Sequence, residues 1–106
     1  MMARVTKITT IPAPKTMPCG GHEVEVRLVQ GLAASTGNVG TCCVATNLIE
    51  IDDGLDSESK TVTLIHENIE LVNTIWRLNM DHDDIDRLSE AFYQSLCGMG
   101  IEIDWS

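Results

Sequence analysis

Apolar and polar residues alternate in the first half of the chain and repeat with a helical period in the second half. Residues 23–29 read Glu-Val-Glu-Val-Arg-Leu-Val, which is typical of a strand with one buried and one wet face. Residues 41–45 and 48–51 are short apolar stretches on either side of Thr46 and Asn47, a pair that favours a tight turn. These segments therefore predict a hairpin that follows the first strand.

Three further segments have weaker patterns. Residues 4–10 are rich in β-branched side chains and predict an edge strand, which ends at the proline-rich stretch of residues 12–18. Residues 31–40 are small and polar, and they predict a loop. The tail, residues 101–106, is apolar and acidic, a composition that fits either a docked short strand or a loose end.

A long helix is predicted from residue 57 to about Leu78, a stretch without glycine or proline. Asp56 or Ser57 is expected to cap its start, because either side chain accepts hydrogen bonds from amide groups of the first turn. The apolar positions recur at helical spacing and form a wide sector that is expected to lie against the sheet. One stripe of this sector contains Val62, Ile65, Ile69, Val72 and Trp76, and the neighbouring stripe contains Leu64, Leu71, Ile75 and Leu78.

A second helix is predicted to start within residues 81–84, where acidic side chains suit the positive end of the helix dipole, and to stop at Gly98. His82 falls on the edge of its inner face. The expected fold is α+β in a single domain, residues 1–106, with a small antiparallel sheet packed against the first helix and the second helix alongside. The inner face of the second helix is predicted to be Ile85, Leu88, Phe92 and Leu96.

The charge of the chain argues against two classes of partner. At a net charge of −9, the chain lacks the excess of Lys and Arg with which proteins bind nucleic acid or an anionic membrane surface. No apolar run approaches the roughly 20 residues needed to cross a bilayer, and residues 1–10 lack the layout of a secretion signal. We therefore expect a cytoplasmic protein, and the sequence does not indicate an oligomeric state.

The four cysteines, Cys19, Cys42, Cys43 and Cys97, include no Cys-x-x-Cys pair, which disfavours a cysteine zinc site. Cys42 and Cys43 are adjacent on a predicted strand and are expected to point to opposite faces. Without a secretion signal, all four are expected to be reduced thiols.

The polar side of the first helix carries a near-match to a zinc-peptidase motif. In His-Glu-x-x-His, two ligands four residues apart meet one metal on one helical face, and the Glu beside the first ligand acts as general base. Here His66 is followed by Glu67, and Glu70 stands at the position of the second ligand. Since a carboxylate is an ordinary zinc ligand, His66 and Glu70 are candidate ligands and Glu67 is the candidate catalytic base.

The third ligand must come from elsewhere, because a catalytic zinc ion takes three protein ligands and one water. His82 is favoured because the positive end of the second helix disfavours a protonated imidazole, and a metal needs the neutral form. Glu90 is the competing ligand, but it lies well round the second helix from the inner stripe. His82 reaches the site only if the first helix ends early or the chain folds back, since a helix rises about 1.5 Å per residue.

Three segments together carry a family resemblance. They are residues 48–51 (Leu-Ile-Glu-Ile), residues 63–67 (Thr-Leu-Ile-His-Glu) and residues 85–94 (Ile-Asp-Arg-Leu-Ser-Glu-Ala-Phe-Tyr-Gln). With these segments, residues 40–96 resemble small phage-type and mobile-element proteins of the ImmA/IrrE-like zincin group. The resemblance implies a minimal zincin-like fold, metallopeptidase ancestry and a third metal ligand, typically an acid, at the start of the second helix, where this sequence has His82 in the equivalent place. Glu70 departs from the second histidine that is usual in that group.

Two functions are expected from these observations. The first is a zinc-dependent metallopeptidase in which His66, Glu70 and His82 bind zinc and Glu67 activates water to hydrolyse a peptide or protein substrate. The alternative is a non-catalytic interaction or regulatory module of a phage or mobile element that retains a relic of the metal site. This alternative predicts little bound metal and no effect of Glu67→Gln on any phenotype.

Overall fold

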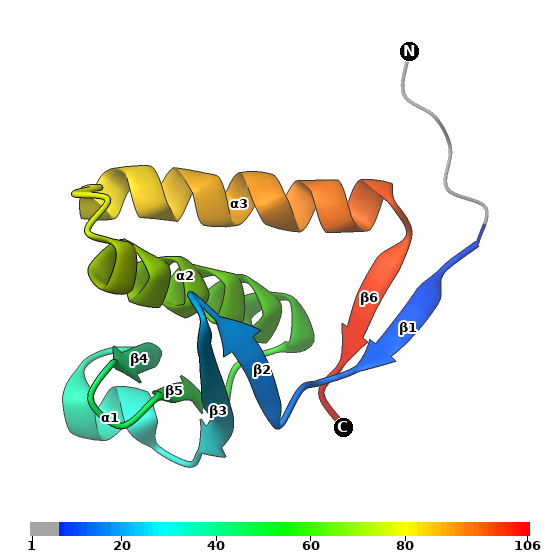
Figure 1. Ribbon diagram of the computed structural model, residues 1–106. Helices are drawn as coiled ribbons and strands as arrows, with labels where there is room; N and C mark the ends of the chain where they lie inside the picture. Colours follow the sequence, from blue (N-terminus) through cyan, green and yellow to red (C-terminus); the bar gives the residue numbers. More distant parts are fainter. Residues whose placement is uncertain (1–6) are drawn as a thin grey trace.

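The computed structural model describes residues 7–106, which form strands and helices in an α+β arrangement, and this confirms the predicted class (Figure 1). The strands are β1 (Thr9–Pro12), β2 (Thr16–Cys19), β3 (His22–Val29), β4 (Gly40–Cys43), β5 (Leu48–Asp52) and β6 (Ile101–Asp104). The helices are α1 (Leu32–Thr36), α2 (Ser57–Trp76) and α3 (His82–Gly98). Within these residues, no helix is long and apolar enough to cross a membrane.

The main sheet has the strand order β2-β3-β5-β4 and is mixed, so the prediction of an antiparallel sheet was wrong in this respect. The predicted hairpin is present as antiparallel β4 and β5, with Asn47 in a left-handed conformation at the turn. However, β3 and β5 pair in parallel, with Val26 opposite Ile49. The reason is the strand order. The chain passes from β3 to the edge strand β4 and then turns back, so β5 lies between β4 and β3 and runs parallel to β3.

The connection between β3 and β4 contains the short helix α1, where the sequence predicted a loop. The buried carboxylate of Asp52 holds this helix, because it accepts hydrogen bonds from the backbone N–H groups of Ala33 (2.8 Å) and Gly54 (2.7 Å). These bonds lower the pKa of Asp52. A non-local partner therefore makes one helical turn stable in a segment of weak propensity.

The C-terminal tail docks as strand β6, which pairs in parallel with β1, so that Ile11 lies opposite Ile103. Trp105 then turns into the core and its Nε1 donates a hydrogen bond to Thr61 Oγ1 on α2 (2.9 Å). Strand β1 begins at Thr9, later than the predicted residues 4–10, of which residues 4–6 lie outside the described part of the chain. Strand β2 was not predicted, and its Pro18 is tolerated because β2 is an edge strand.

Helix α2 crosses the main sheet and buries mainly one of its two predicted apolar stripes there, since only Val72 of the other stripe packs against the core, and only partly. Asp56 caps its start by accepting a hydrogen bond from the N–H of Ser59 (2.7 Å). Leu64 and Leu71 pack into the core. The other stripe ends in Trp76, which is 61% exposed rather than packed. The core cluster contains Cys19, Val24, Val26, Ile49, Ile51, Leu64, Leu71 and Trp105.

Helix α3 lies along α2, and its buried face differs from the predicted one. Ile85 and Ser89 are each only 1% exposed, whereas Leu88 and Phe92 are exposed at the edge of the helix pair. The Ser89 hydroxyl is satisfied inside the interface by donating to the Ile85 carbonyl (2.7 Å). The small serine side chain fits the close approach of the two helices, so this position is buried although it is not apolar.

The chain folds back sharply between the two helices. Helix α2 ends at Trp76, and Arg77 and Asn79 both adopt left-handed conformations, at φ 53° and 61°. The amide side chain of Asn73 closes the turn by accepting from the Met80 N–H (2.9 Å) and donating to the Met80 carbonyl (3.2 Å). His82 was expected to reach His66 only if the first helix ended early or the chain folded back. The turn provides this reversal, because α3 returns along α2.

Candidate metal site

The two histidines that the sequence selected as metal ligands meet between α2 and α3. The centroids of the His66 and His82 imidazole rings are 5.0 Å apart, and the rings are arranged edge to face. His66 comes from the middle of α2 and its side chain is 15% exposed, while His82 is the first residue of α3 and its side chain is 67% exposed. One imidazole is thus anchored by packing, and the other has room to rotate.

Asp86 completes this cluster, and the sequence reasoning missed it. Its carboxylate lies between the two rings, with Oδ1 3.0 Å from His66 Nδ1 and Oδ2 3.5 Å from His82 Nε2. The signal was present, because His82 and Asp86 are four residues apart and therefore share one face of α3. His66 and Glu70 on α2 have the same four-residue spacing, and they were the pair predicted to bind the metal from the His-Glu-x-x-His pattern.

The donor chemistry of the cluster fits a zinc ion. One donor atom from each of His66, His82 and Asp86 lies within 4.8 Å of the other two. In tetrahedral zinc sites with metal–ligand bonds of about 2.0–2.1 Å, donor atoms lie about 3.4 Å apart. Since the side chains of His82 and Asp86 are more than half exposed, they can rotate inward to close this difference. Two imidazoles and one carboxylate would leave a position for water.

Glu67 stands beside the cluster as a buried carboxylate. The residue is 8% exposed, and its Oε2 lies 3.8 Å from His66 Nε2. Burial raises its pKa above the ordinary value for glutamate, although the nearby His66 opposes this rise. A carboxylate with a raised pKa holds a proton more readily, which suits a group that takes a proton from water and passes it on.

Strand β4 covers Glu67 and makes it buried. Cys42 lies against this carboxylate, and its pKa is raised to about 12 by burial first and then by Glu67. The thiol is therefore protonated at neutral pH and acts as a hydrogen-bond donor toward Glu67. At Gly40 the backbone comes so close to α2 that a Cβ there would lie 3.1 Å from Glu67 Cγ and overlap Thr63 Cγ2.

The other two carboxylates that the sequence considered lie apart from the three-residue cluster. Glu70 is half-buried and lines the same cleft, but it is not among the residues whose donor atoms lie within 4.8 Å of one another. Glu90 is exposed on α3 and lines a different hollow together with Leu55 and Glu58. The structure therefore brings together two of the three predicted ligands, with Asp86 as the nearest carboxylate.

The cluster opens into a cleft of about 550 Å³ between α2, the start of α3 and the edge of the main sheet. Residues 38–42 form one wall, and His66, Glu67 and Glu70 lie on the opposite side. The volume is within the range of about 300–1,000 Å³ that is usual for small-molecule and substrate sites. The cleft is thus large enough to hold a short stretch of extended peptide beside the donor cluster.

We predict that Gly40→Ala lowers the free energy of unfolding by about 1–3 kcal/mol, because the added methyl group must displace Thr63 or Glu67 from β4. Chemical unfolding with urea measures the change. Gly98→Ala is the matched control, since a Cβ at Gly98 meets no atom within 4 Å and alanine favours the helix. Equal stability of the Gly40→Ala variant and the wild-type protein would contradict the close packing of α2 on β4.

Comparisons with protein-family models, curated proteins and solved structures find no match to this chain. The resemblance to ImmA/IrrE-like zincins therefore remains a prediction that rests on the sequence segments at residues 48–51, 63–67 and 85–94.

Proposed function

We propose that the protein is a zinc-dependent hydrolase of peptide bonds. His66, His82 and Asp86 would bind the metal, and Glu67 would act as general base. The observation that carries the proposal is the convergence of two imidazoles and a carboxylate, with donor atoms within 4.8 Å of one another, beside a buried glutamate in a cleft. This places Asp86 in the role that the sequence assigned to Glu70.

Each side chain has a defined task in this proposal. Zinc, when bound, supplies a Lewis acid and lowers the pKa of a bound water to about 7. His82, the first residue of α3, would bind the metal through a ring nitrogen, and Asp86 one turn later would bind it through a carboxylate oxygen. Glu67 accepts a proton from the attacking water and returns it to the leaving amine, for which its raised pKa is suited.

The edge of the main sheet supports a peptide as the substrate class. Strand β4 is the last strand in the order β2-β3-β5-β4, and residues 38–42 line the cleft. The backbone groups on the outer side of an edge strand can pair with an extended peptide, which adds as a further strand. Such a peptide would run past Gly40 and present its backbone to Glu67 and the histidine pair.

The proposal is tested by the zinc content of purified protein, measured by elemental analysis beside single variants of the ligands. We expect about one zinc ion per chain, lost in His66→Ala, His82→Ala and Asp86→Ala. Glu70→Ala decides between the two carboxylates, because it should keep the metal if Asp86 is the ligand. Wild-type protein that takes up no zinc at neutral pH would overturn the metal site and the hydrolase with it.

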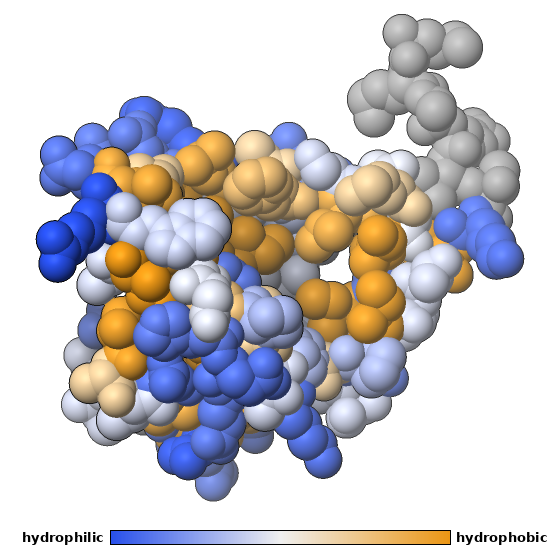
Figure 2. Space-filling model, viewed as in Figure 1, coloured by the Kyte–Doolittle hydropathy of each residue, from blue (hydrophilic) through white to orange (hydrophobic). Residues whose placement is uncertain are grey.

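A second candidate function is a non-catalytic interaction module, which the exposed aromatic residues favour. Trp76 is 61% exposed and Phe92 is 52% exposed, and Figure 2 shows apolar side chains along the boundary between α2 and α3. Large exposed apolar side chains that gather on one face commonly mark a binding surface. This alternative is supported if the protein carries no zinc and Glu67→Gln changes no phenotype, and it is rejected if Glu67→Gln abolishes a hydrolytic activity.

A further inference from the structure

The two long helices share an open apolar groove. Because the chain folds back between them, α2 and α3 lie side by side and run in opposite directions (Figure 1). A groove of about 340 Å³ lies between them, and Figure 2 shows apolar side chains along this boundary. The apolar residues that line the groove are Ile65, Ile69, Phe92, Leu96 and Met99.

Each helix contributes to this face a stripe with the spacing of a helix-bundle seam. On both helices the stripe advances by four, three and four residues, which is the repeat of the seam in coiled coils and four-helix bundles. The stripe on α3 is exposed at all four positions, and the stripe on α2 ends in the exposed Trp76. Two neighbouring stripes of this kind form half of a four-helix bundle. The stripes are Ile65, Ile69, Val72 and Trp76 on α2, and Leu88, Phe92, Ser95 and Met99 on α3.

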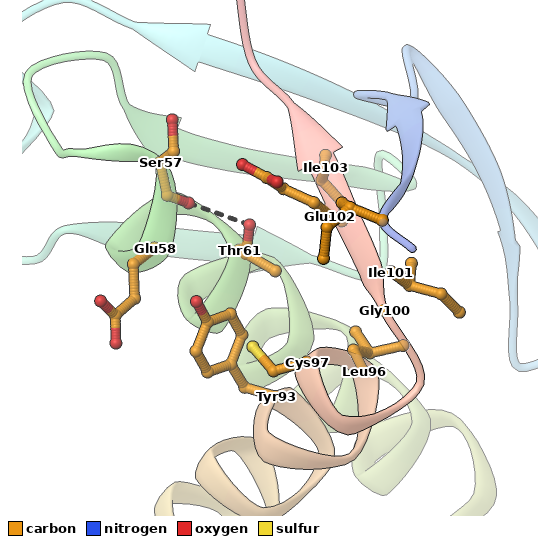
Figure 3. A pocket seen from close by; sticks show the side chains of 11 residues that line it. Ser57, Glu58, Thr61, Tyr93, Leu96, Cys97, Gly100, Ile101, Glu102 and Ile103 are labelled. Carbon is orange, nitrogen blue, oxygen red and sulfur yellow. Dashed lines mark hydrogen bonds between the residues drawn. The ribbon is translucent and has the colours of Figure 1, made fainter. Parts of the chain in front are cut away.

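This face is uncharged, although the chain is strongly acidic. None of the residues in the two stripes or in the lining of the groove is charged. By contrast, Figure 3 shows the carboxylates of Glu58 and Glu102 beside the neighbouring cavity, between the start of α2 and strand β6. Two chains that each carry a net charge of −9 repel one another where their acidic side chains meet. The face between α2 and α3 is where they can approach without such a contact.

The exposed area of the face matches a small interface. Trp76 and Phe92 are more than half exposed and, at about 150–250 Å² per aromatic side chain, leave roughly 250 Å² uncovered. Leu88 and Met99 add roughly 100 Å², and the half-buried floor of the groove brings the face to roughly 500 Å² per copy. A standard interface buries about 800 Å² per partner, and transient complexes bury less. The face therefore has the size of a weak, reversible contact.

We propose that a second copy of this chain covers the groove, so that two α2–α3 pairs form a symmetric four-helix arrangement. In a two-fold interface the same patch contacts itself, so Phe92 at the rim of each groove would insert into the groove of the other copy. None of the groove residues lines the metal cleft, so this inference does not depend on the proposed hydrolase. A helix from a different protein is the competing occupant, and it would leave the purified chain monomeric.

The test is sedimentation equilibrium of the full chain between about 5 μM and about 1 mM, where the mass should rise toward that of two chains and not exceed it. We expect a dissociation constant on the order of 100 μM, so the chain is monomeric at the lowest concentration. Higher salt should tighten the dimer, because it screens the repulsion between two chains of net charge −9. A monomer over the whole range, or a mass that rises without limit, would overturn the proposal.

Charged variants locate the contact on the groove. Phe92→Glu should weaken the dimer by at least about tenfold, because its carboxylate would be buried against apolar side chains. Gln94→Glu is the matched control, since it adds the same charge at an exposed position on the outer side of α3. Met99→Glu repeats the test just after the end of α3, and circular dichroism checks that all three variants are folded. Equal weakening by Phe92→Glu and Gln94→Glu would reject the groove as the interface.

Tryptophan fluorescence gives an independent readout. Trp76 is exposed at the end of the α2 stripe, whereas the other tryptophan, Trp105, is already buried in the core. The emission of the wild-type chain should therefore shift to the blue as its concentration rises through the dissociation constant. In Trp76→Phe, which keeps an aromatic side chain in the stripe, the emission comes from Trp105 and should stay constant. A shift of equal size in this variant would place the contact at the tail and overturn the proposal.

Discussion

Replacing Glu67 by glutamine is expected to lower the rate of peptide hydrolysis by about 10²–10⁴-fold while the zinc ion stays bound. Glutamine has nearly the same shape as glutamate, so it can keep the packing against Gly40 and Cys42. It cannot accept a proton from water, however, so the general-base step proposed for Glu67 would be lost. Because Glu67 is not one of the three clustered donors, its replacement should leave the affinity for zinc largely intact.

The experiment compares hydrolysis of a quenched fluorescent peptide library by wild-type protein and by variants of equal zinc content. Glu90→Gln is the control, because it removes the same charge as Glu67→Gln. Glu90 lies on α3 in a different hollow, so its replacement should have little effect on the rate. If Glu67→Gln and the wild type hydrolyse the library at the same rate, Glu67 is not the base. If the wild type binds zinc but hydrolyses no peptide of the library, the site serves another purpose.

The second large effect is expected at Trp105, whose replacement by alanine should destabilise the protein by about 3–5 kcal/mol. Trp105 is 7% exposed, belongs to the core cluster and donates its indole N–H to Thr61 Oγ1. Its removal leaves a cavity between α2 and the tail and also breaks the hydrogen bond. Strand β6 would lose its anchor, and a two-stranded ribbon such as β1–β6 is only marginally stable by itself.

Urea unfolding followed by circular dichroism measures this loss without relying on tryptophan fluorescence. The other tryptophan of the chain is a matched control, because Trp76 is 61% exposed. Trp76→Ala should change stability by no more than about 0.5 kcal/mol, as is usual for surface positions. Similar losses in both variants would contradict the docking of the tail in the core.

The regular elements were predictable where the information is local. The β4–β5 hairpin follows from two apolar stretches around a turn residue, and the starts of α2 and α3 follow from Asp56 and Asp81, whose carboxylates accept amide hydrogen bonds three residues on. The candidate site was partly predictable for the same reason. His66 and Glu67 are adjacent on one helix, and the dipole argument selected His82 at the start of the next helix.

The exposure of Phe92 was not predictable, because it depends on how α3 is rotated about its axis. The spacing of His82 and Asp86 was visible in the sequence, but only this rotation brings Asp86 to His66. The hydrophobic pattern placed Phe92 on the inner face, yet the buried line of the helix runs through Ile85 and Ser89. The rotation is determined by the turn at Arg77 and Asn79 and by the close approach of the two helices. A periodic pattern defines an amphipathic stripe, but neighbouring positions on its edges can exchange burial at little cost.

By itself, the sequence determined the α+β class, the two long helices and the adjacency of His66 and Glu67 on α2, whereas the meeting of His66 with His82 required the turn between the helices. The tertiary structure alone decided the mixed order of the sheet, the docking of the tail through Trp105, and the burial of Glu67 under β4. The physical reason is the range of the interactions. Caps, turns and helical spacing act within a few residues, whereas strand order and burial depend on contacts between segments far apart in the chain.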